Sequence, residues 1–69
     1  MILTRRQWET IVYQMYFDCA ETCFDIVTLI EEGFLHKEMD EPVLVEGLTP
    51  QEKAVILDYV YDRNGNLRI

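Results

Sequence analysis

The longest stretch without a helix breaker limits most strongly what this chain can fold into. Residues 5–32 contain no glycine and no proline. Thr4, followed three residues later by Gln7, has the pattern of a capping box and marks a helix start. Gly33 has the position of a C′ residue that ends the helix. The sequence therefore predicts one long N-terminal helix over residues 5–32.

The polar residues of this stretch recur at steps of three or four, which forms one narrow stripe along a helix. They are Gln7, Thr10, Gln14, Asp18, Glu21, Asp25, Thr28 and Glu32. Nearly every other position is apolar, whereas an amphipathic surface helix needs an apolar face only somewhat wider than about 100°. We therefore expect this helix to pack against partners on more than one side.

A second, shorter helix is predicted to begin at Pro50. Thr49 supplies an N-cap hydroxyl, Pro50 suits the first helical position, and Glu52 places an acid in the first turn. We expect this helix to end near Tyr61, with its apolar side chains facing inward. These are Val55, Ile56, Tyr59 and Val60.

The remaining segments are a connector and a C-terminal tail. Residues 34–46 form an acidic connector in which residues 43–45 can be extended. Asn64 and Gly65 predict a helix end or a tight turn, after which residues 67–69 run along the surface or pair with residues 1–3 or 43–45. The expected fold class is all-α: one long and one shorter helix in a single domain, residues 1–69, with minor strand pairing at the termini left open.

The predicted long helix leads us to expect a helical homodimer. A helix over residues 5–32 is about 42 Å long, whereas a compact chain of 69 residues has a radius of gyration of about 11 Å. One flank, with Tyr13, Phe17, Ala20, Phe24 and Val27, can pack against the chain's own second helix. The other is the predicted dimer interface: Trp8, Val12, Met15, Cys19, Ile26 and Leu29. A break near residues 18–22 would instead allow a compact monomer.

The charge of the chain indicates its kind of partner. The formal net charge is −7, which opposes direct binding to nucleic acid or to anionic lipid and favours a basic protein surface. Residues 7–52 hold eleven acids and one base, Lys37. The predicted partner-binding residues are Asp18, Glu21, Asp25, Glu31, Glu32, Glu38, Asp40 and Glu41.

The acidic stripe has two interpretations. On one continuous helix Asp18, Glu21, Asp25 and Glu32 would be separated by roughly 4.5, 6 and 10.5 Å along the axis. Phosphates of one DNA strand are spaced comparably, so a protein that normally binds nucleic acid could bind the stripe. The alternative is that the stripe is only the solvated face of a helix whose other sides are buried.

The sequence offers little to catalysis or to metal binding. Cys19, Cys23 and His36 are fewer ligands than a structural zinc site needs. Residues 62–66 have the alternating oxygen ligands that begin a calcium loop, but Leu67 stands where such a loop needs glycine. With no serine and one histidine, the chain lacks a serine nucleophile with its base. We expect no enzyme, no cofactor and no metal.

The function expected from these observations is binding. The chain is interpreted as a small acidic inhibitor or adaptor that docks on a basic site of another protein, by analogy with phage-encoded regulators of host proteins. A nucleic-acid-binding site is one such basic site. The alternative is a structural oligomerisation module whose acids serve only solubility. The apolar runs fall far short of the roughly 20 residues of a membrane span, and no secretory h-region is evident. A cytoplasmic location with free thiols is therefore expected.

Overall fold

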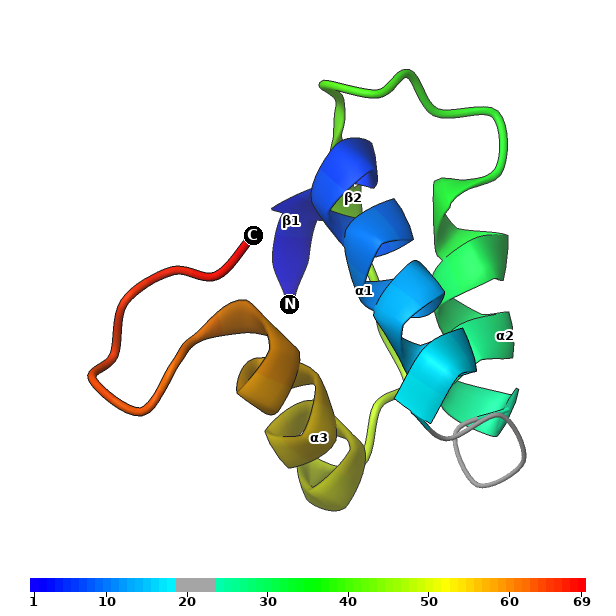
Figure 1. The fold of residues 1–69 in the computed structure, drawn as a ribbon. Helices are drawn as coiled ribbons and strands as arrows, with labels where there is room; N and C mark the ends of the chain where they lie inside the picture. The colour runs from blue at the N-terminus through cyan, green and yellow to red at the C-terminus, as the bar shows by residue number, and fades with distance from the viewer. Residues whose placement is uncertain (19–23) are drawn as a thin grey trace.

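The chain forms a small, mostly helical domain. The computed structural model describes residues 1–18 and 24–69. In this part of the chain, three helices and two short strands follow one another (Figure 1). They are β1 (Ile2–Thr4), α1 (Arg5–Asp18), α2 (Phe24–Phe34), β2 (Pro42–Leu44) and α3 (Pro50–Val60). The predicted helical character is confirmed, because the described residues are mostly helical. The predicted number of two helices is wrong, because three helices are present in the described ranges together with a two-stranded sheet.

The predicted single helix over residues 5–32 is wrong, because α1 and α2 lie side by side and run in opposite directions (Figure 1). The guanidinium carbon of Arg5, at the start of α1, lies 5.0 Å from the centre of the Phe34 ring, at the end of α2. In one straight helix these two residues would be more than about 40 Å apart. The physical reason is burial, since a helix that is apolar on several sides hides more surface when its second half packs against its first.

Both ends of α1 are consistent with this packing. The capping box predicted at its start is confirmed: the Gln7 amide nitrogen donates to Thr4 Oγ1 over 3.2 Å, and the Thr4 amide nitrogen donates to Gln7 Oε1 over 3.0 Å. Two more amides of the first turn bond to the connector. The Arg5 amide donates to the Glu41 carbonyl oxygen, and the Arg6 amide donates to the Met39 carbonyl oxygen. The connector therefore completes the N-terminus of α1.

Gly33 was expected to end the helix, and this prediction is wrong. Gly33 lies inside α2 with Phe34 after it, and its backbone is not left-handed. Instead, α2 packs closely on the segment after β2 at this point. A Cβ added at Gly33 would lie 3.2 Å from Val45 Cγ2, so the glycine allows the close approach.

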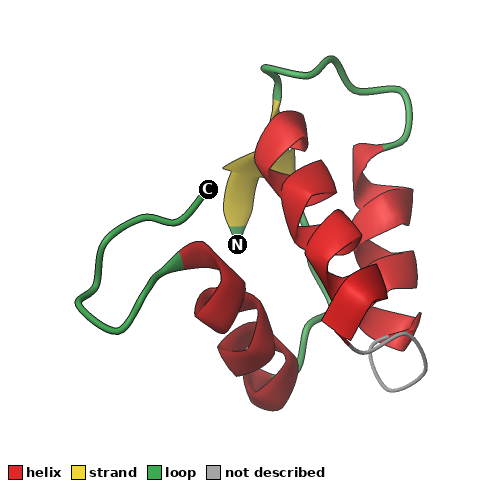
Figure 2. Cartoon of the chain, viewed as in Figure 1, coloured by secondary structure: helices red, strands yellow, loops and turns green. Residues whose placement is uncertain are grey.

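The two strands pair antiparallel, with Leu3 opposite Val43 and Ile2 opposite Leu44 (Figure 2). The extended conformation expected near residues 43–45 is thus present, and its partner is the N-terminal segment. The C-terminal tail pairs elsewhere. Tyr61 and Leu67 form an isolated bridge, and the Arg68 amide donates to the Val60 carbonyl over 2.7 Å.

The core lies where α1, α2 and α3 meet the inner side of the sheet. Its described members are Trp8, Ile11, Val12, Met15, Ile26, Val27, Ile30, Phe34, Val43, Val45, Ile56 and Val60. Trp8 is fully buried, and its indole N–H donates to the Val43 carbonyl oxygen over 3.0 Å. This bond connects α1 to β2 through the interior.

The start of the third helix is confirmed. Thr49 is the N-cap of α3, its hydroxyl accepts from the Glu52 amide, and the Glu52 carboxylate accepts from the Thr49 amide. Ile56 and Val60 are buried as expected, while Val55 and Tyr59 are half-buried. The radius of gyration is 11.3 Å, close to the value of about 11 Å for a compact chain of this length.

Candidate protein-binding surface

The acids predicted to bind a partner do not form one line. Asp18 ends α1, whereas Asp25 and Glu32 lie on α2 and Glu38 lies in the connector. The spacings calculated for a continuous helix therefore do not apply between Asp18 and Asp25. Glu21 lies outside the described residues.

Four of the predicted acids already have partners within the chain. Two connector acids form ion pairs, Asp40 with Arg6 over 3.5 Å and Glu41 with Lys37 over 3.1 Å. Two helix acids accept hydrogen bonds from tyrosine hydroxyls, Asp18 from Tyr59 over 3.2 Å and Glu31 from Tyr16 over 2.8 Å. Both ion pairs are exposed to solvent, so each contributes at most about 1 kcal/mol to stability.

The other described acids of the set, Asp25, Glu32 and Glu38, are exposed and have no ion pair with the described residues. No base lies within α2 itself. Asp25 and Glu32 are seven residues apart, which is two helical turns, or about 10.5 Å along the axis of α2. These three carboxylates are therefore the part of the predicted site that has neither an ion pair nor a side-chain hydrogen bond with a described residue.

Tyr16 ties α1 to α2 at the edge of this surface. The hydrogen bond that its hydroxyl donates to Glu31 raises the pKa of Tyr16 above its ordinary value, and the negative charge of Glu31 acts in the same direction. The hydroxyl therefore keeps its proton at neutral pH and remains a donor. This contact could not be expected from a continuous helix, in which residues 16 and 31 are about 22 Å apart.

The predicted dimer interface lies mostly inside the chain. Trp8, Val12, Met15 and Ile26 are buried in its own core, and Leu29 is half-buried. Cys19 lies outside the described residues. The buried side chains offer no surface to a second copy, so this assignment of interface residues is corrected. The homodimer itself stays a prediction.

The opposite flank of the predicted helix is the one that reaches the surface. Tyr13, Phe17 and Phe24 are 66%, 76% and 60% exposed, whereas Val27 is buried. Sequence reasoning assigned this flank to the chain's second helix. The residue types carry a signal for this exposure. Tyr13, Phe17 and Phe24 are all aromatic, whereas the buried positions of α1 and α2 are rich in isoleucine and valine.

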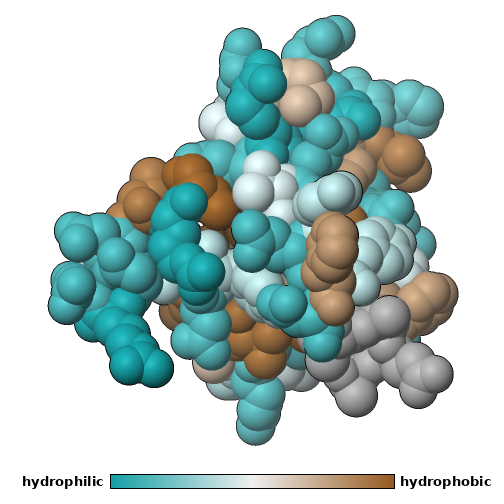
Figure 3. All heavy atoms as spheres, in the orientation of Figure 1, coloured by the Kyte–Doolittle hydropathy of each residue, from teal (hydrophilic) through white to brown (hydrophobic). Residues whose placement is uncertain are grey.

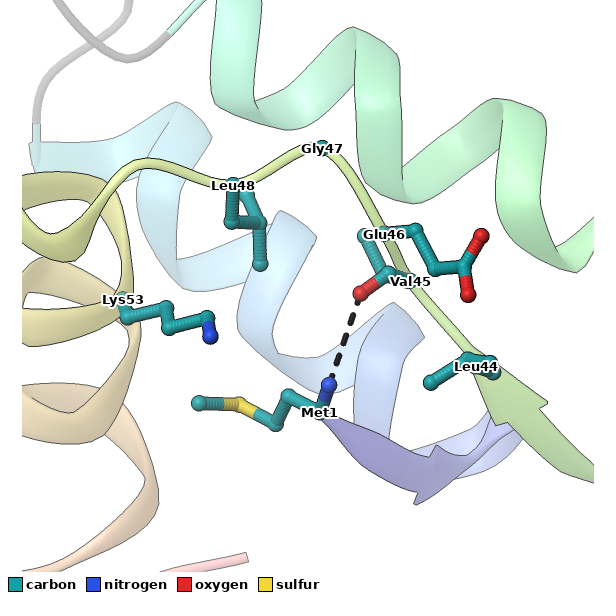
Figure 4. Close-up of a pocket in the computed structure, with 7 residues that line it drawn as sticks. All are labelled: Met1, Leu44, Val45, Glu46, Gly47, Leu48 and Lys53. Carbon is teal, nitrogen blue, oxygen red and sulfur yellow. Dashed lines mark hydrogen bonds between the residues drawn. The ribbon is translucent and has the colours of Figure 1, made fainter.

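A separate pocket of about 320 Å³ lies between the segment after β2 and the start of α3. Its lining residues are Met1, Leu44, Val45, Glu46, Gly47, Leu48 and Lys53. Figure 4 shows the side chains of Met1 and Lys53 extending toward one another, with the Glu46 carboxylate turned away from Lys53.

Within residues 1–18 and 24–69, no group of three histidine, cysteine or acidic side chains could hold a metal ion. Cys19 and Cys23 lie outside these ranges, and His36 is exposed. Asp62, in the incomplete calcium pattern, instead accepts from the amides of Asn64 and Asn66.

None of the described helices has the length and the apolar character needed to cross a membrane.

Comparison with protein-family models finds no match, and comparisons with curated proteins and with solved structures find none either.

Proposed function

We propose that this protein acts by binding the basic surface of another protein, as an inhibitor or adaptor. The observation that carries the proposal is the exposed outer side of α2, where Asp25 and Glu32 have no ion pair with a described residue. The net charge of −7 adds long-range attraction for a basic partner and raises the rate of encounter. Phage-encoded regulators of host proteins offer an analogy for such a role.

The connector contributes differently from α2. Glu38 is exposed and without an ion pair, whereas Asp40 and Glu41 pair with Arg6 and Lys37. To bind Asp40 or Glu41, a basic partner has to displace Arg6 or Lys37. No described residue forms an ion pair with Asp25, Glu32 or Glu38, so the partner displaces none there. We therefore assign the larger part of the electrostatic attraction to the latter three carboxylates.

The test is affinity capture with matched charge reversals. One variant carries Asp25→Lys and Glu32→Lys. Its control carries Glu46→Lys, before α3, and Asp58→Lys, on α3, which change the net charge by the same amount away from α2. The first variant should lose a partner that the parent and the control retain. Binding by the parent should weaken as salt rises, because exposed charges are screened beyond about 8 Å at physiological ionic strength.

Two controls complete this experiment. Circular dichroism must show that the first variant keeps its helices, since lysine near the start of α2 costs about 0.3–1 kcal/mol through the helix dipole. Duplex DNA added as a competitor tests whether the partner's site normally binds nucleic acid. Equal capture by both variants would refute the proposal and leave the acids a role in solubility alone, as in a structural oligomerisation module.

A further inference from the structure

The outer side of the α1 and α2 pair carries an exposed aromatic surface that the electrostatic argument does not use. We call Tyr13, Phe17 and Phe24 the aromatic face. The rings of Tyr13 and Phe17 are one helical turn apart on α1, with centroids 5.3 Å apart at an interplanar angle of 60°. Most of each side chain is exposed. Aromatic side chains are enriched among the residues that dominate protein interfaces.

The aromatic face extends across both helices. Tyr16, three residues after Tyr13 and so on the same side of α1, bonds to Glu31 of α2. Phe24, Thr28 and Glu31 are separated by four and three residues, so they lie on one side of α2. Phe24 therefore lies on the side of α2 that faces the Tyr16 contact, and the aromatic rings stand on either side of the line where the two helices meet.

The carboxylates of α2 border this surface. Asp25 follows Phe24 directly, and Glu32 follows Glu31 directly, each about 100° further around the same helix. Figure 3, which shows the α1 side of the molecule, has hydrophilic groups over most of its area, with apolar groups gathered beside the chain termini and in smaller places on the helices. The aromatic face thus has the carboxylates of α2 along one margin.

We infer that the aromatic face binds an amphipathic helix of the partner, one with apolar side chains on one side and lysine or arginine beside them. This inference rests on the proposed function and names the element recognised. Two helices packed side by side present ridges and a groove into which a third helix packs, and an amphipathic helix is recognised through apolar anchors at helical spacing. Its basic residues would meet Asp25 and Glu32.

The charge argues against two other occupants. A second copy of this chain would bring a further net charge of −7 to the face, and like charges oppose association. An anionic lipid surface is repelled by the same acids. A basic amphipathic helix can both pack apolar side chains on the aromatic rings and place positive charges beside Asp25 and Glu32.

The test uses a synthetic helix of about four turns, composed of leucine and lysine with the leucines at helical spacing. A second peptide replaces each leucine by glutamine and keeps the lysines. Fluorescence anisotropy of the labelled peptides, at about 0.15 M salt, measures their dissociation constants for the whole protein. The leucine peptide should bind, and the glutamine peptide should bind at least about tenfold more weakly.

The protein variants are Phe17→Ala and, as a matched control, Leu44→Ala, which removes another exposed apolar side chain, but one that lies on the sheet. Phe17→Ala should raise the dissociation constant of the leucine peptide about tenfold or more. Leu44→Ala should leave this dissociation constant unchanged. Both substitutions are at exposed positions, so circular dichroism should show parental helix content.

Several outcomes would overturn the inference. Absence of binding by the leucine peptide would do so, as would equal effects of Phe17→Ala and Leu44→Ala. Self-association that disappears in Phe17→Ala would show that a second copy occupies the face. If charge reversal at Asp25 and Glu32 abolishes capture of a natural partner while Phe17→Ala does not, the proposed function stands and the aromatic face is not its site.

Discussion

Replacing Trp8 by phenylalanine should lower the free energy of unfolding, because it removes a buried hydrogen bond as well as part of the ring. Phenylalanine keeps an aromatic ring in the core but removes the N–H that donates to the Val43 carbonyl across 3.0 Å. Both groups are within the buried interior. A buried polar group that loses its partner costs about 1–3 kcal/mol. We therefore expect a loss in the free energy of unfolding within that range.

The magnitude matters because the whole domain is small. A chain of 69 residues has a free energy of unfolding of about 3–10 kcal/mol. Trp8→Ala would remove about 3–5 kcal/mol, which comes close to that total. Trp8→Phe is the more informative variant, because it leaves a folded protein whose stability can be measured.

The assay is urea denaturation followed by far-ultraviolet circular dichroism, since the substitution removes the only tryptophan. Tyr13→Phe is the matched control, because it also removes a polar group from an aromatic side chain of α1, but at an exposed position. The control should shift stability by no more than about 0.5 kcal/mol. A Trp8→Phe variant as stable as this control would refute the assignment of Trp8 as the buried tie between α1 and β2.

Three further predictions follow from local geometry. Thr49→Ala should lower the free energy of unfolding by about 1 kcal/mol through loss of the α3 N-cap, and Pro50→Ala by much less; equal effects in denaturant titration would contradict the cap. Hydrogen bonds from the Asn66 and Asn64 amides hold the pKa of Asp62 below its ordinary value, so the turn should gain stability from this carboxylate above about pH 4 and lose it as pH falls through the lowered pKa. Carboxyl carbon shifts measured by nuclear magnetic resonance check this, and a midpoint at or above the ordinary value would disprove it. Sedimentation at micromolar concentration tests the predicted homodimer: twice the chain mass of 8.2 kDa would support it, and a monomer mass would exclude it.

The sequence alone predicted the features that depend on near neighbours. The capping boxes at Thr4 and Thr49 each involve groups three residues apart, so their geometry is present in the local sequence. The span of α3 followed from the same kind of signal. The acidic character of the surface was also predictable, because charged side chains remain in water unless they are paired in the interior.

Part of the candidate site could also be predicted from the sequence alone. Asp25, Glu32 and Glu38 were predicted to be exposed, and they are. The sequence could not predict which acids form ion pairs within the chain. Arg6 and Asp40, for example, are far apart along the chain and meet only when the connector packs against α1. The contact between Tyr16 and Glu31 likewise depends on the pairing of two helices.

Tertiary structure decided where the predicted long helix divides and which apolar rows become core. Residues 5–32 are apolar on several sides, so local preference cannot choose between the row of Trp8 and Met15 and the row of Tyr13 and Phe17. The choice follows from packing: in the folded chain α2, α3 and the sheet all bury the first row, and Trp8 bonds to Val43. The second row is left in water. Burial is a property of all the elements together, because the free energy of hiding a side chain depends on what the rest of the chain can place against it.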